Sequence, residues 1–263
     1  MTRADFHVHT TFCDGTESPA AMVRAAIDRG LEAVGFAGHS HTPFDESWCM
    51  SPVGTETYRG EVEHLKAMYG AKIRIFCGVE QDFFSDLPPE GWDYVIGSVH
   101  YLRRGDDYLP LDESPELLRR AAAQYFGGDL LSLAEAYYET VAGVAERTGC
   151  SLIGHFDLIA KFNEGGALFD EDDPRYVAAW QGAADALLRT GVPFEVNTGA
   201  IARGFRSVPY PSPAIHGYLA ARGARFLLSG DAHAPDGLCF QFDRWRDAYA
   251  LPEPPAFPPE TGD

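Results

Sequence analysis

Histidine and carboxylate side chains occur near the start of the chain at a spacing that suits metal binding. The segment "FHVHTTFCDG" (residues 6–15) places His7 and His9 on either side of one valine, and Asp14 follows closely. In a β-strand, residues two apart point to the same face, so these two imidazoles would lie side by side. A single imidazole on a strand is usually an ordinary polar residue, whereas two on one face favour a shared metal ion. Such an ion needs further ligands from elsewhere in the chain.

Seven short, apolar, β-rich runs are spaced along the chain, with stretches of helical character between most of them. The runs are residues 4–9, 33–39, 73–80, 93–100, 151–157, 192–198 and 225–233. Helices are predicted within residues 18–30, 55–70, 114–149, 173–191 and 212–223, and the third of these stretches is broken near Gly127 and Gly128. Strands that alternate with helices predict βα units around a parallel sheet. Seven units favour a closed or nearly closed barrel, and a doubly wound open sheet is the alternative.

Each strand-like run carries a potential metal ligand at or near its C-terminal end. In a βα-barrel these ends converge on one face, where active sites are built. The sixth run offers Glu195 or Asn197. The set predicted to bind metal is His7, His9, Asp14, His39, Glu80, His100, His155, Asp231 and His233.

The chemistry of this set predicts the kind of metal and the reaction. Imidazole and carboxylate ligands suit zinc, iron or manganese. Nine ligands exceed what one ion can use while leaving a position open, so we expect two or three divalent or transition metal ions, with Glu80 as a bridge. Such a cluster lowers the pKa of a bound water and clamps phosphoryl oxygens during in-line attack. Neither a G-x-S-x-G motif nor a P-loop occurs, so hydrolysis by a metal-bound hydroxide is the expected mechanism.

Composition and charge limit the domain organisation and the partners. The chain has 263 residues, 45% of them hydrophobic, which fits one large domain over residues 1–250 and a proline-rich tail, 251–263, that adds no core. Its 21 basic and 39 acidic residues give a net charge of −18, which argues against a nucleic-acid partner. With no long apolar stretch and no room for a signal peptide, we expect no membrane span and a cytoplasmic location. The five cysteines lack C-x-x-C spacing and are expected to be reduced, and Cys13 is not expected to bind metal.

The ordered motifs resemble those of the polymerase-and-histidinol-phosphatase (PHP) superfamily, in particular its monofunctional histidinol-phosphatase branch. They are "HVHTTFCDG", "GFAGHS", "GVEQDF", "GSVHYL", "GHFDLIAKF", "EVNTGA" and "SGDAH", and the resemblance spans residues 5–243. It implies a distorted (β/α)7 TIM-like barrel with a trinuclear metal site at the C-terminal face of the strands. It also implies a phosphomonoesterase that acts on a small molecule, histidinol phosphate, in histidine biosynthesis.

The resemblance further implies how the ligands divide among three ions. The first ion would be held by His7, His9, Glu80 and Asp231, the second by Asp14, His39 and His233, and the third by Glu80, His100 and His155. Asp231 and His233 are also expected to be catalytic. One position departs from the family, in which Asp usually precedes the histidine of the second motif, because this chain has Gly38 there. A partner that orients His39 would then be missing or supplied elsewhere.

Substrate-binding residues are predicted from the same strand ends. Lys161 and Arg203 follow the fifth and sixth runs, so we expect them to bind the phosphate oxygens that are turned away from the metals. Tyr101, with Phe83 and Asp45 as weaker candidates, would contact an aromatic, cationic leaving group.

Three histidines and three other function classes complete the predictions. His41 is expected to face the substrate or the solvent, and His64 and His216 are expected on helix surfaces. A PHP phosphoesterase for phosphotyrosine or nucleotides is the main alternative. An amidohydrolase would normally offer a carbamylated lysine and eight strands, which we do not find, and a non-catalytic metal-binding module would not need a complete ligand set. The oligomeric state is left open.

Overall fold

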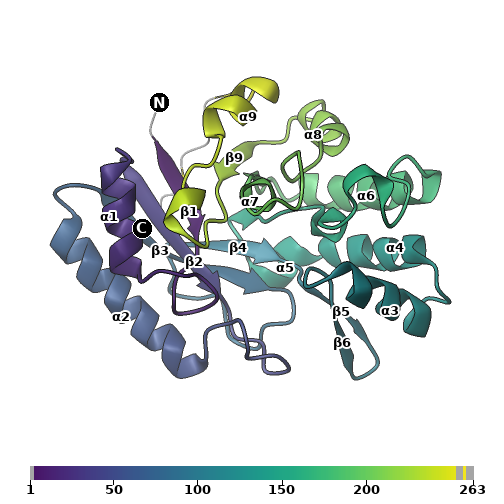
Figure 1. Ribbon diagram of the computed structural model, residues 1–263, viewed down its shortest axis with the longest axis horizontal. Coiled ribbons are helices and arrows are strands. Elements are labelled where there is room, and N and C mark those ends of the chain that lie inside the picture. The colour runs from purple at the N-terminus through teal and green to yellow at the C-terminus, as the bar shows by residue number, and fades with distance from the viewer. Residues whose placement is uncertain (1–2, 253–256, 259–263) are drawn as a thin grey trace.

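A single parallel sheet organises the chain in the computed structural model, which describes residues 3–252 and 257–258 (Figure 1). Its strands, in spatial order, are β1 (Ala4–Val8), β2 (Ala33–His39), β3 (Arg74–Asp82), β4 (Tyr94–Ser98), β7 (Leu152–Ile153), β8 (Phe194–Asn197) and β9 (Phe226–Ser229). Each strand pairs in parallel with its neighbours in this order. All seven strands correspond to the predicted apolar runs.

The sheet closes into a barrel between its first strand and the residues after its last. The backbone N–H of His9 donates to the carbonyl of Ala232 at 2.9 Å, and the N–H of Ala232 donates to the carbonyl of His7 at 2.8 Å. Val8 and Ala232 thereby form a parallel bridge. The distorted, nearly closed (β/α)7 barrel is confirmed, and the doubly wound open sheet is excluded.

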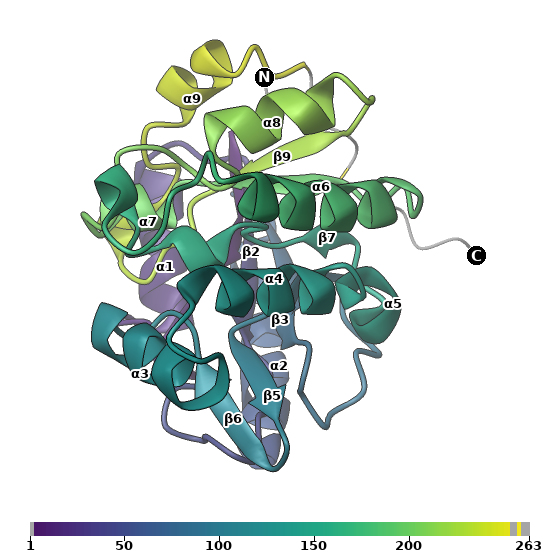
Figure 2. The ribbon, with the colours of Figure 1, turned by 90° about the vertical axis from the view of Figure 1, so that its right-hand side faces the viewer.

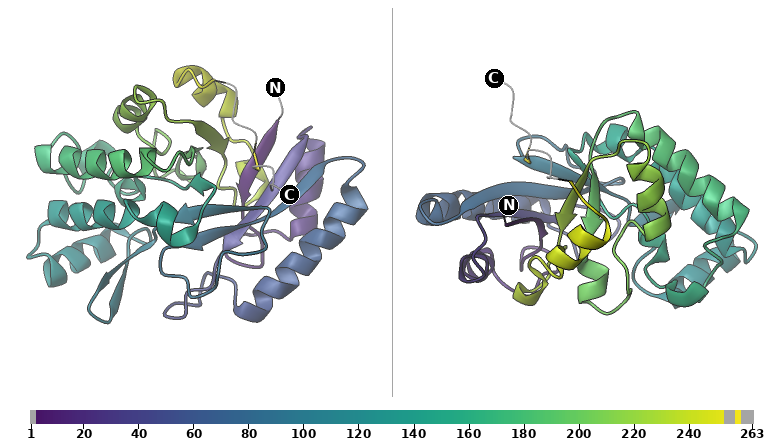
Figure 3. Two further views of the ribbon diagram at one scale, coloured as in Figure 1. Left: turned by 180° about the vertical axis from the view of Figure 1, so that it is seen from behind. Right: turned by 90° about the horizontal axis from the view of Figure 1, so that it is seen from above.

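Helices surround the barrel, with α1 and α2 on one side and α3, α4 and α6 on the other (Figures 2 and 3). Their bounds are α1 (Pro19–Asp28), α2 (Pro52–Tyr69), α3 (Pro115–Tyr125), α4 (Leu130–Val141), α5 (Val144–Thr148), α6 (Pro174–Leu188), α7 (Gly199–Ala202), α8 (Pro213–Ala220) and α9 (Phe242–Ala248). Ser18, Ser51 and Ser114 each cap a helix by accepting a hydrogen bond from the backbone three residues on, and a proline follows each serine. These caps are why the predicted helix starts fall close to the observed ones.

Several elements differ from the prediction. An antiparallel hairpin of β5 (Tyr101–Arg104) and β6 (Asp107–Pro110) extends the chain beyond β4, where neither a strand nor a helix was predicted. Residues 114–149 form three helices, because the chain breaks a second time between α4 and α5. The helices α7 and α9 were not predicted. Among the described residues, no helix has the length and apolarity needed to cross a membrane.

Aromatic side chains fill the barrel toward the N-terminal ends of the strands. The Tyr94 hydroxyl donates to the carbonyls of Phe6 and Phe36 at 2.6 and 2.8 Å. Gly78 leaves room for this ring, since a Cβ there would lie 2.4 Å from it. The Phe257 ring packs 5.2 Å from Phe6 and 5.1 Å from Tyr94. The prediction that the tail adds no core is therefore wrong at Phe257, while residues 253–256 and 259–263 lie outside the described residues.

Candidate metal centre

The predicted ligands lie at the C-terminal end of the barrel. His7, His39 and Glu80 are in strands, and the others follow strands within the loops. The structure brings the whole predicted set into one cluster, and apart from Asp14 and His233 its members are buried. Because the strands are parallel and the barrel is nearly closed, residues distant in sequence meet at this one end.

Glu80 lies at the centre of the buried part of the cluster. Its Oε2 is 2.9 Å from His39 Nδ1, 3.1 Å from His7 Nε2 and 3.5 Å from His9 Nε2. These four atoms are buried and none has a hydrogen-bond partner. A buried polar atom without a partner costs about 1–3 kcal/mol, so four that face one another are unfavourable unless something binds between them. Three imidazole nitrogens and one carboxylate oxygen form a donor set that fits a metal ion.

The second oxygen of Glu80 faces two further histidines. Its Oε1 is 2.8 Å from His155 Nε2 and 3.3 Å from His100 Nε2, and it accepts a hydrogen bond from the Ser98 hydroxyl at 2.6 Å. Glu80 therefore presents different oxygens to different histidines, as a bridging carboxylate would.

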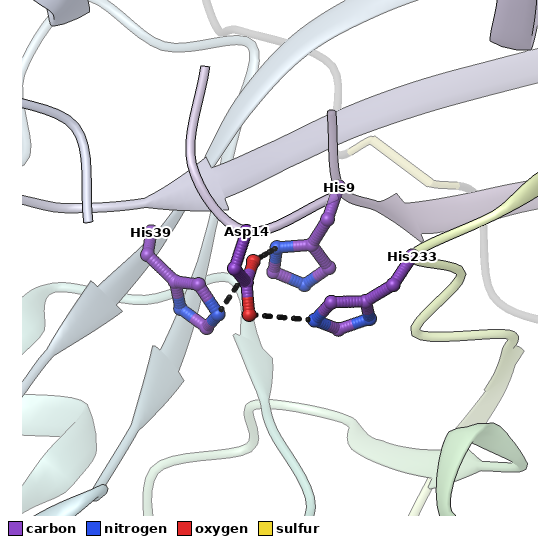
Figure 4. Close-up of side chains that lie close together, drawn as sticks. All are labelled: His9, Asp14, His39 and His233. Atoms are coloured by element: carbon purple, nitrogen blue, oxygen red, sulfur yellow. Dashed lines mark hydrogen bonds and ion pairs between the residues drawn. The ribbon is translucent and has the colours of Figure 1, made fainter. Parts of the chain in front are cut away.

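Asp14 joins the solvent-facing part of the cluster, where it lies between three imidazoles (Figure 4). Its Oδ1 is 3.5 Å from both His9 Nδ1 and His39 Nε2, and its Oδ2 is 3.0 Å from His233 Nε2. Ligand atoms of these four residues all lie within 4.8 Å of one another. The groups formed by His7, His9 and Glu80 and by His39, Glu80 and His100 meet the same distance limit. These overlapping groups fit more than one ion.

The electrostatics of the cluster favour bound positive charge. Burial lowers the pKa of His39, but Glu80 and Asp14 outweigh it and raise that pKa to about 9. Burial also lowers the pKa of His7, yet Glu195 and Glu80 raise it well above its usual value. Protons and metal ions therefore compete for the same nitrogens. His9 differs, because burial and the neighbouring histidines lower its pKa to about 3, which keeps it neutral and able to bind metal.

Two buried carboxylates orient the histidines from outside the cluster. Glu195 accepts hydrogen bonds from His7 Nδ1 at 2.5 Å and from the backbone N–H of His155 at 2.7 Å. Asp82 Oδ2 accepts from both the backbone N–H and Nδ1 of His100 at 3.1 Å. Such partners fix which imidazole nitrogen is free to bind a metal. The prediction left Glu195 as one of two alternatives and missed Asp82, although Asp82 is two residues after Glu80 on β3 and so shares its face.

Gly38 leaves no side chain that could orient His39 from behind. A Cβ there would lie 3.1 Å from Met50 Sδ and 3.6 Å from Cys13 Sγ, so two sulfur atoms occupy this space. His39 turns both ring nitrogens toward the cluster, and its ring packs edge-to-face with the Trp48 ring, with ring centres 4.3 Å apart. Packing against Trp48 thus takes the place of an orienting hydrogen bond.

A cavity of about 420 Å³ opens onto the cluster. Lys161 and Arg203 line it, as predicted for groups that bind phosphate. Arg203 Nη2 donates to Asp231 Oδ2 at 2.9 Å, and Lys161 Nζ donates to Asp112 Oδ2 at 3.1 Å. Both cations are therefore held in place by a carboxylate beside the cluster.

The remaining lining of the cavity is aromatic and acidic. Tyr101 belongs to it, as predicted, together with Trp48, Asp112 and Glu113, which the prediction missed. Trp48 Nε1 donates to the Tyr101 hydroxyl at 2.7 Å, and that hydroxyl donates to Asp45 Oδ2 at 2.7 Å. These hydrogen bonds fix the two aromatic side chains relative to each other.

Other predicted side chains lie elsewhere. His41 is buried, and its Nδ1 and Nε2 lie 2.8 Å from Asp86 and 3.2 Å from Glu46, so it does not face the solvent, and it is absent from the described lining of the cavity. Asp45 and Phe83 are also absent from the described lining of the cavity. Two acidic partners explain why His41 turns away.

The two helix histidines have different environments. His64 is exposed, as predicted. His216 is buried between Tyr249 and Phe226, with ring centres 4.1 and 4.5 Å away, so its predicted surface position is wrong. The reason is that Tyr249, which directly follows the unpredicted helix α9, packs on that face of α8. All five cysteines are free.

Comparison with known proteins identifies relatives along most of the chain. Residues 5–199 match the family described as "PHP domain". A Deinococcus radiodurans protein named "Probable histidinol-phosphatase" is 32% identical over 250 residues, which cover 90% of this chain and 89% of that protein. A Schizosaccharomyces pombe protein of the same name is 28% identical over 236 residues, which cover 81% of this chain and 74% of that protein.

Solved structures share the fold. A Listeria monocytogenes structure superposes with a TM-score of 0.78 at 20% identity, over 92% of this chain and 99% of that one. Histidinol phosphate phosphatase from Lactococcus lactis, complexed with zinc, L-histidinol and phosphate, superposes with a TM-score of 0.69 at 20% identity, over 96% and 95% of the two chains. Both similarities support the barrel architecture.

Proposed function

The chain belongs to the PHP domain family, and from this premise we propose that it is a metal-dependent phosphomonoesterase whose preferred substrate is histidinol phosphate. One observation carries the proposal. Unpartnered, buried atoms of Glu80 and three histidines face one another at a cavity that Lys161 and Arg203 also line. Metal ligands and fixed cations beside one cavity suit the binding of a phosphate group, which is a dianion near neutral pH.

We propose that two or three ions of zinc, iron or manganese bind the cluster. The overlapping groups described above support more than one ion, with Glu80 bridging. The ligands would be His7, His9, Asp14, His39, Glu80, His100, His155, Asp231 and His233. When bound, such ions lower the pKa of a coordinated water and polarise the phosphoryl oxygens.

The side chains of the protein would bind and orient the phosphate. Arg203 lies between two residues proposed to be catalytic, with Nη2 2.9 Å from Asp231 Oδ2 and Nη1 2.8 Å from His233 Nδ1. Burial raises the pKa of Asp231, but Arg203 and His7 outweigh it and keep the carboxylate ionised, so it can hold the guanidinium at the edge of the cluster. Lys161, held by Asp112, would bind a second phosphate oxygen. Fixed donors of this kind stabilise the charge of the transition state with little reorganisation.

The rest of the cavity supports the choice of leaving group. Histidinol carries a cationic amine and an imidazole, and the cavity offers the rings of Trp48 and Tyr101 together with the carboxylates of Asp112 and Glu113. The net charge of −18 also favours a cationic group over a nucleotide. The names of the two curated relatives agree with this substrate. The reaction would belong to histidine biosynthesis, and the cytoplasmic location stays a prediction.

A panel of phosphomonoesters assayed on protein of known metal content tests the proposal. We expect kcat/KM for histidinol phosphate to exceed that for p-nitrophenyl phosphate, phosphotyrosine and nucleoside monophosphates by at least ~10-fold, which is about 1.4 kcal/mol of transition-state binding. A higher value for phosphotyrosine or a nucleotide would overturn the substrate. Equal activity of the metal-stripped protein would overturn the metal dependence.

A further inference from the structure

The histidines of the cluster differ in the partner that holds their second ring nitrogen. His7 is held by Glu195 and His100 by Asp82, both through carboxylate oxygens. His9 has no such carboxylate hydrogen bond. The hydrogen bond that its ring makes joins Nδ1 to Cys13 Sγ, at 3.5 Å. Its Nε2 is buried and unpartnered, 3.2 Å from Asp231 Oδ1 and 3.5 Å from Glu80 Oε2.

The local fold explains why a sulfur atom lies beside His9. Cys13 follows β1 in a turn, in which its N–H donates to the carbonyl of Thr10 at 2.9 Å. This turn directs the side chain toward the space beside Gly38. A Cβ at residue 38 would meet Met50 Sδ at 3.1 Å and Cys13 Sγ at 3.6 Å, so the absence of a side chain there makes room for both sulfurs. Gly38 thus makes room for Met50 and for Cys13, whose sulfur also reaches His9 Nδ1.

We propose that Cys13 is a positioning residue of the metal centre, whose thiol sulfur accepts the Nδ1 proton of His9 and so leaves the Nε2 lone pair free for a metal ion held between His9, Glu80 and Asp231. The neutral imidazole has two tautomers, and only the one protonated at Nδ1 leaves Nε2 free to bind a metal. The thiol is not itself a ligand in this arrangement, because its sulfur lies beside Nδ1, whereas the unpartnered nitrogen is Nε2. This inference rests on the metal centre and does not depend on which phosphomonoester is the substrate.

One competing partner for His9 Nδ1 is present. Asp14 Oδ1 is also 3.5 Å away, but it lies equally close to His39 Nε2. If Asp14 binds a metal through this oxygen, Cys13 is left as the acceptor for His9. If Asp14 alone were enough to accept the Nδ1 proton of His9, removal of the thiol would leave zinc binding unchanged.

Zinc binding by three variants tests the role of the thiol. Each protein is stripped of metal and titrated with zinc against a chelator that sets the free zinc concentration. For Cys13→Ala we expect the free zinc concentration needed for half-loading to rise ~10-fold. This is the lower end of the loss of metal affinity seen when a hydrogen-bond partner of a metal-bound histidine is removed, and we choose it because sulfur is a weak acceptor. Cys13→Ser restores an acceptor and should stay within ~3-fold of the unmodified protein. Cys239→Ala is the matched control, since Cys239 is also half-buried but bonds to the carbonyl of Ala4, and it should bind zinc normally.

Nitrogen NMR of the zinc-loaded protein gives a readout that packing alone would not change, because without metal two carboxylates would favour a proton on Nε2. We expect His9 to bind zinc through Nε2 and to carry its proton on Nδ1 in the unmodified protein and in Cys13→Ser, and we expect that proton to exchange faster with solvent in Cys13→Ala. A His9 that binds zinc through Nδ1 in the unmodified protein would overturn the proposal, even if Cys13→Ala failed to fold. Unchanged zinc binding by Cys13→Ala, or an equal loss in Cys13→Ser, would overturn it as well.

Discussion

Glu195 is fully buried beside the proposed metal ligands and accepts hydrogen bonds from four donors, which makes Glu195→Gln an informative substitution. Oε1 accepts from His7 Nδ1 and from the Ser229 hydroxyl. Oε2 accepts from the backbone N–H of His155 at 2.7 Å and from Asn197 Nδ2 at 3.1 Å. Burial raises the pKa of Glu195, but His7 and the other donors outweigh it and keep the carboxylate ionised. Glutamine keeps the size of the side chain and replaces one oxygen with a donor.

Neither orientation of the glutamine amide satisfies these donors. With its nitrogen toward His155, the amide faces a backbone N–H that cannot turn, and Asn197 cannot rotate freely because its Oδ1 accepts from the N–H of Gly199 at 2.8 Å. With its nitrogen toward His7, the amide donates to Nδ1 and forces the proton onto Nε2, the atom that faces Glu80. The first orientation loses two hydrogen bonds to a charged group, and the second blocks a metal ligand.

The expected loss follows from these contacts. Two hydrogen bonds to a charged group, at about 1.5 kcal/mol each, predict that Glu195→Gln lowers the free energy of unfolding of the metal-free protein by ~3 kcal/mol. If the second orientation prevails, zinc affinity instead falls by at least ~10²-fold. Urea unfolding and a zinc titration measure the two quantities. Glu164→Gln is the control, because Glu164 is exposed and accepts from Ser207, and it should change stability by less than ~0.5 kcal/mol. If Glu195→Gln changed both quantities as little as the control, the assigned role of Glu195 would be refuted.

Three further substitutions test other parts of the molecule. Glu113→Gln should lower kcat/KM for histidinol phosphate about fivefold, or about 1 kcal/mol, and leave p-nitrophenyl phosphate unaffected, because only the former carries a cation; equal losses for both substrates would contradict this. Asp231→Asn should lower kcat by at least ~10²-fold, since it removes a ligand and the partner of Arg203, and near-normal turnover would exclude this role. Burial lowers the pKa of His216 from 6.5 to about 4, so the unfolded state binds more protons between these pH values and stability falls as the pH drops. Between pH 6.5 and 4, urea unfolding should therefore show that the free energy of unfolding of His216→Phe falls by ~2 kcal/mol less than that of the unmodified protein. If this free energy changed with pH in the same way in both proteins, that would argue against a buried neutral imidazole.

Much of the histidine and carboxylate cluster could be predicted from the sequence because one short-range rule combines with one topological rule. Residues two apart on a strand share a face, which pairs His7 with His9. The C-terminal ends of parallel strands meet, which joins these residues to Glu80 and His155. Neither rule needs a knowledge of loop conformations, so the cluster depends on the regular part of the fold.

The parts that could not be predicted depend on packing between distant segments. Trp48 reaches the cavity through an irregular loop, and Glu113 reaches it beyond a hairpin that the pattern of apolar residues did not indicate. Stacking of Phe44 on Tyr108, with ring centres 3.6 Å apart, joins that loop to the hairpin. His216 shows the same limit, because the face that α8 buries depends on α9. For Glu195, a single charged residue in a strand could have been either a metal ligand or an orienting partner, and only interatomic distances distinguish the two.

Elemental analysis of the purified protein tests the central claim that the facing atoms around Glu80 are metal ligands. The protein should be prepared without chelators, supplemented with metal and counted for zinc, iron and manganese per chain. We predict two or three ions per chain, since the overlapping ligand groups exceed the needs of one ion. One ion per chain, or none, would contradict the multinuclear centre on which the proposed chemistry depends.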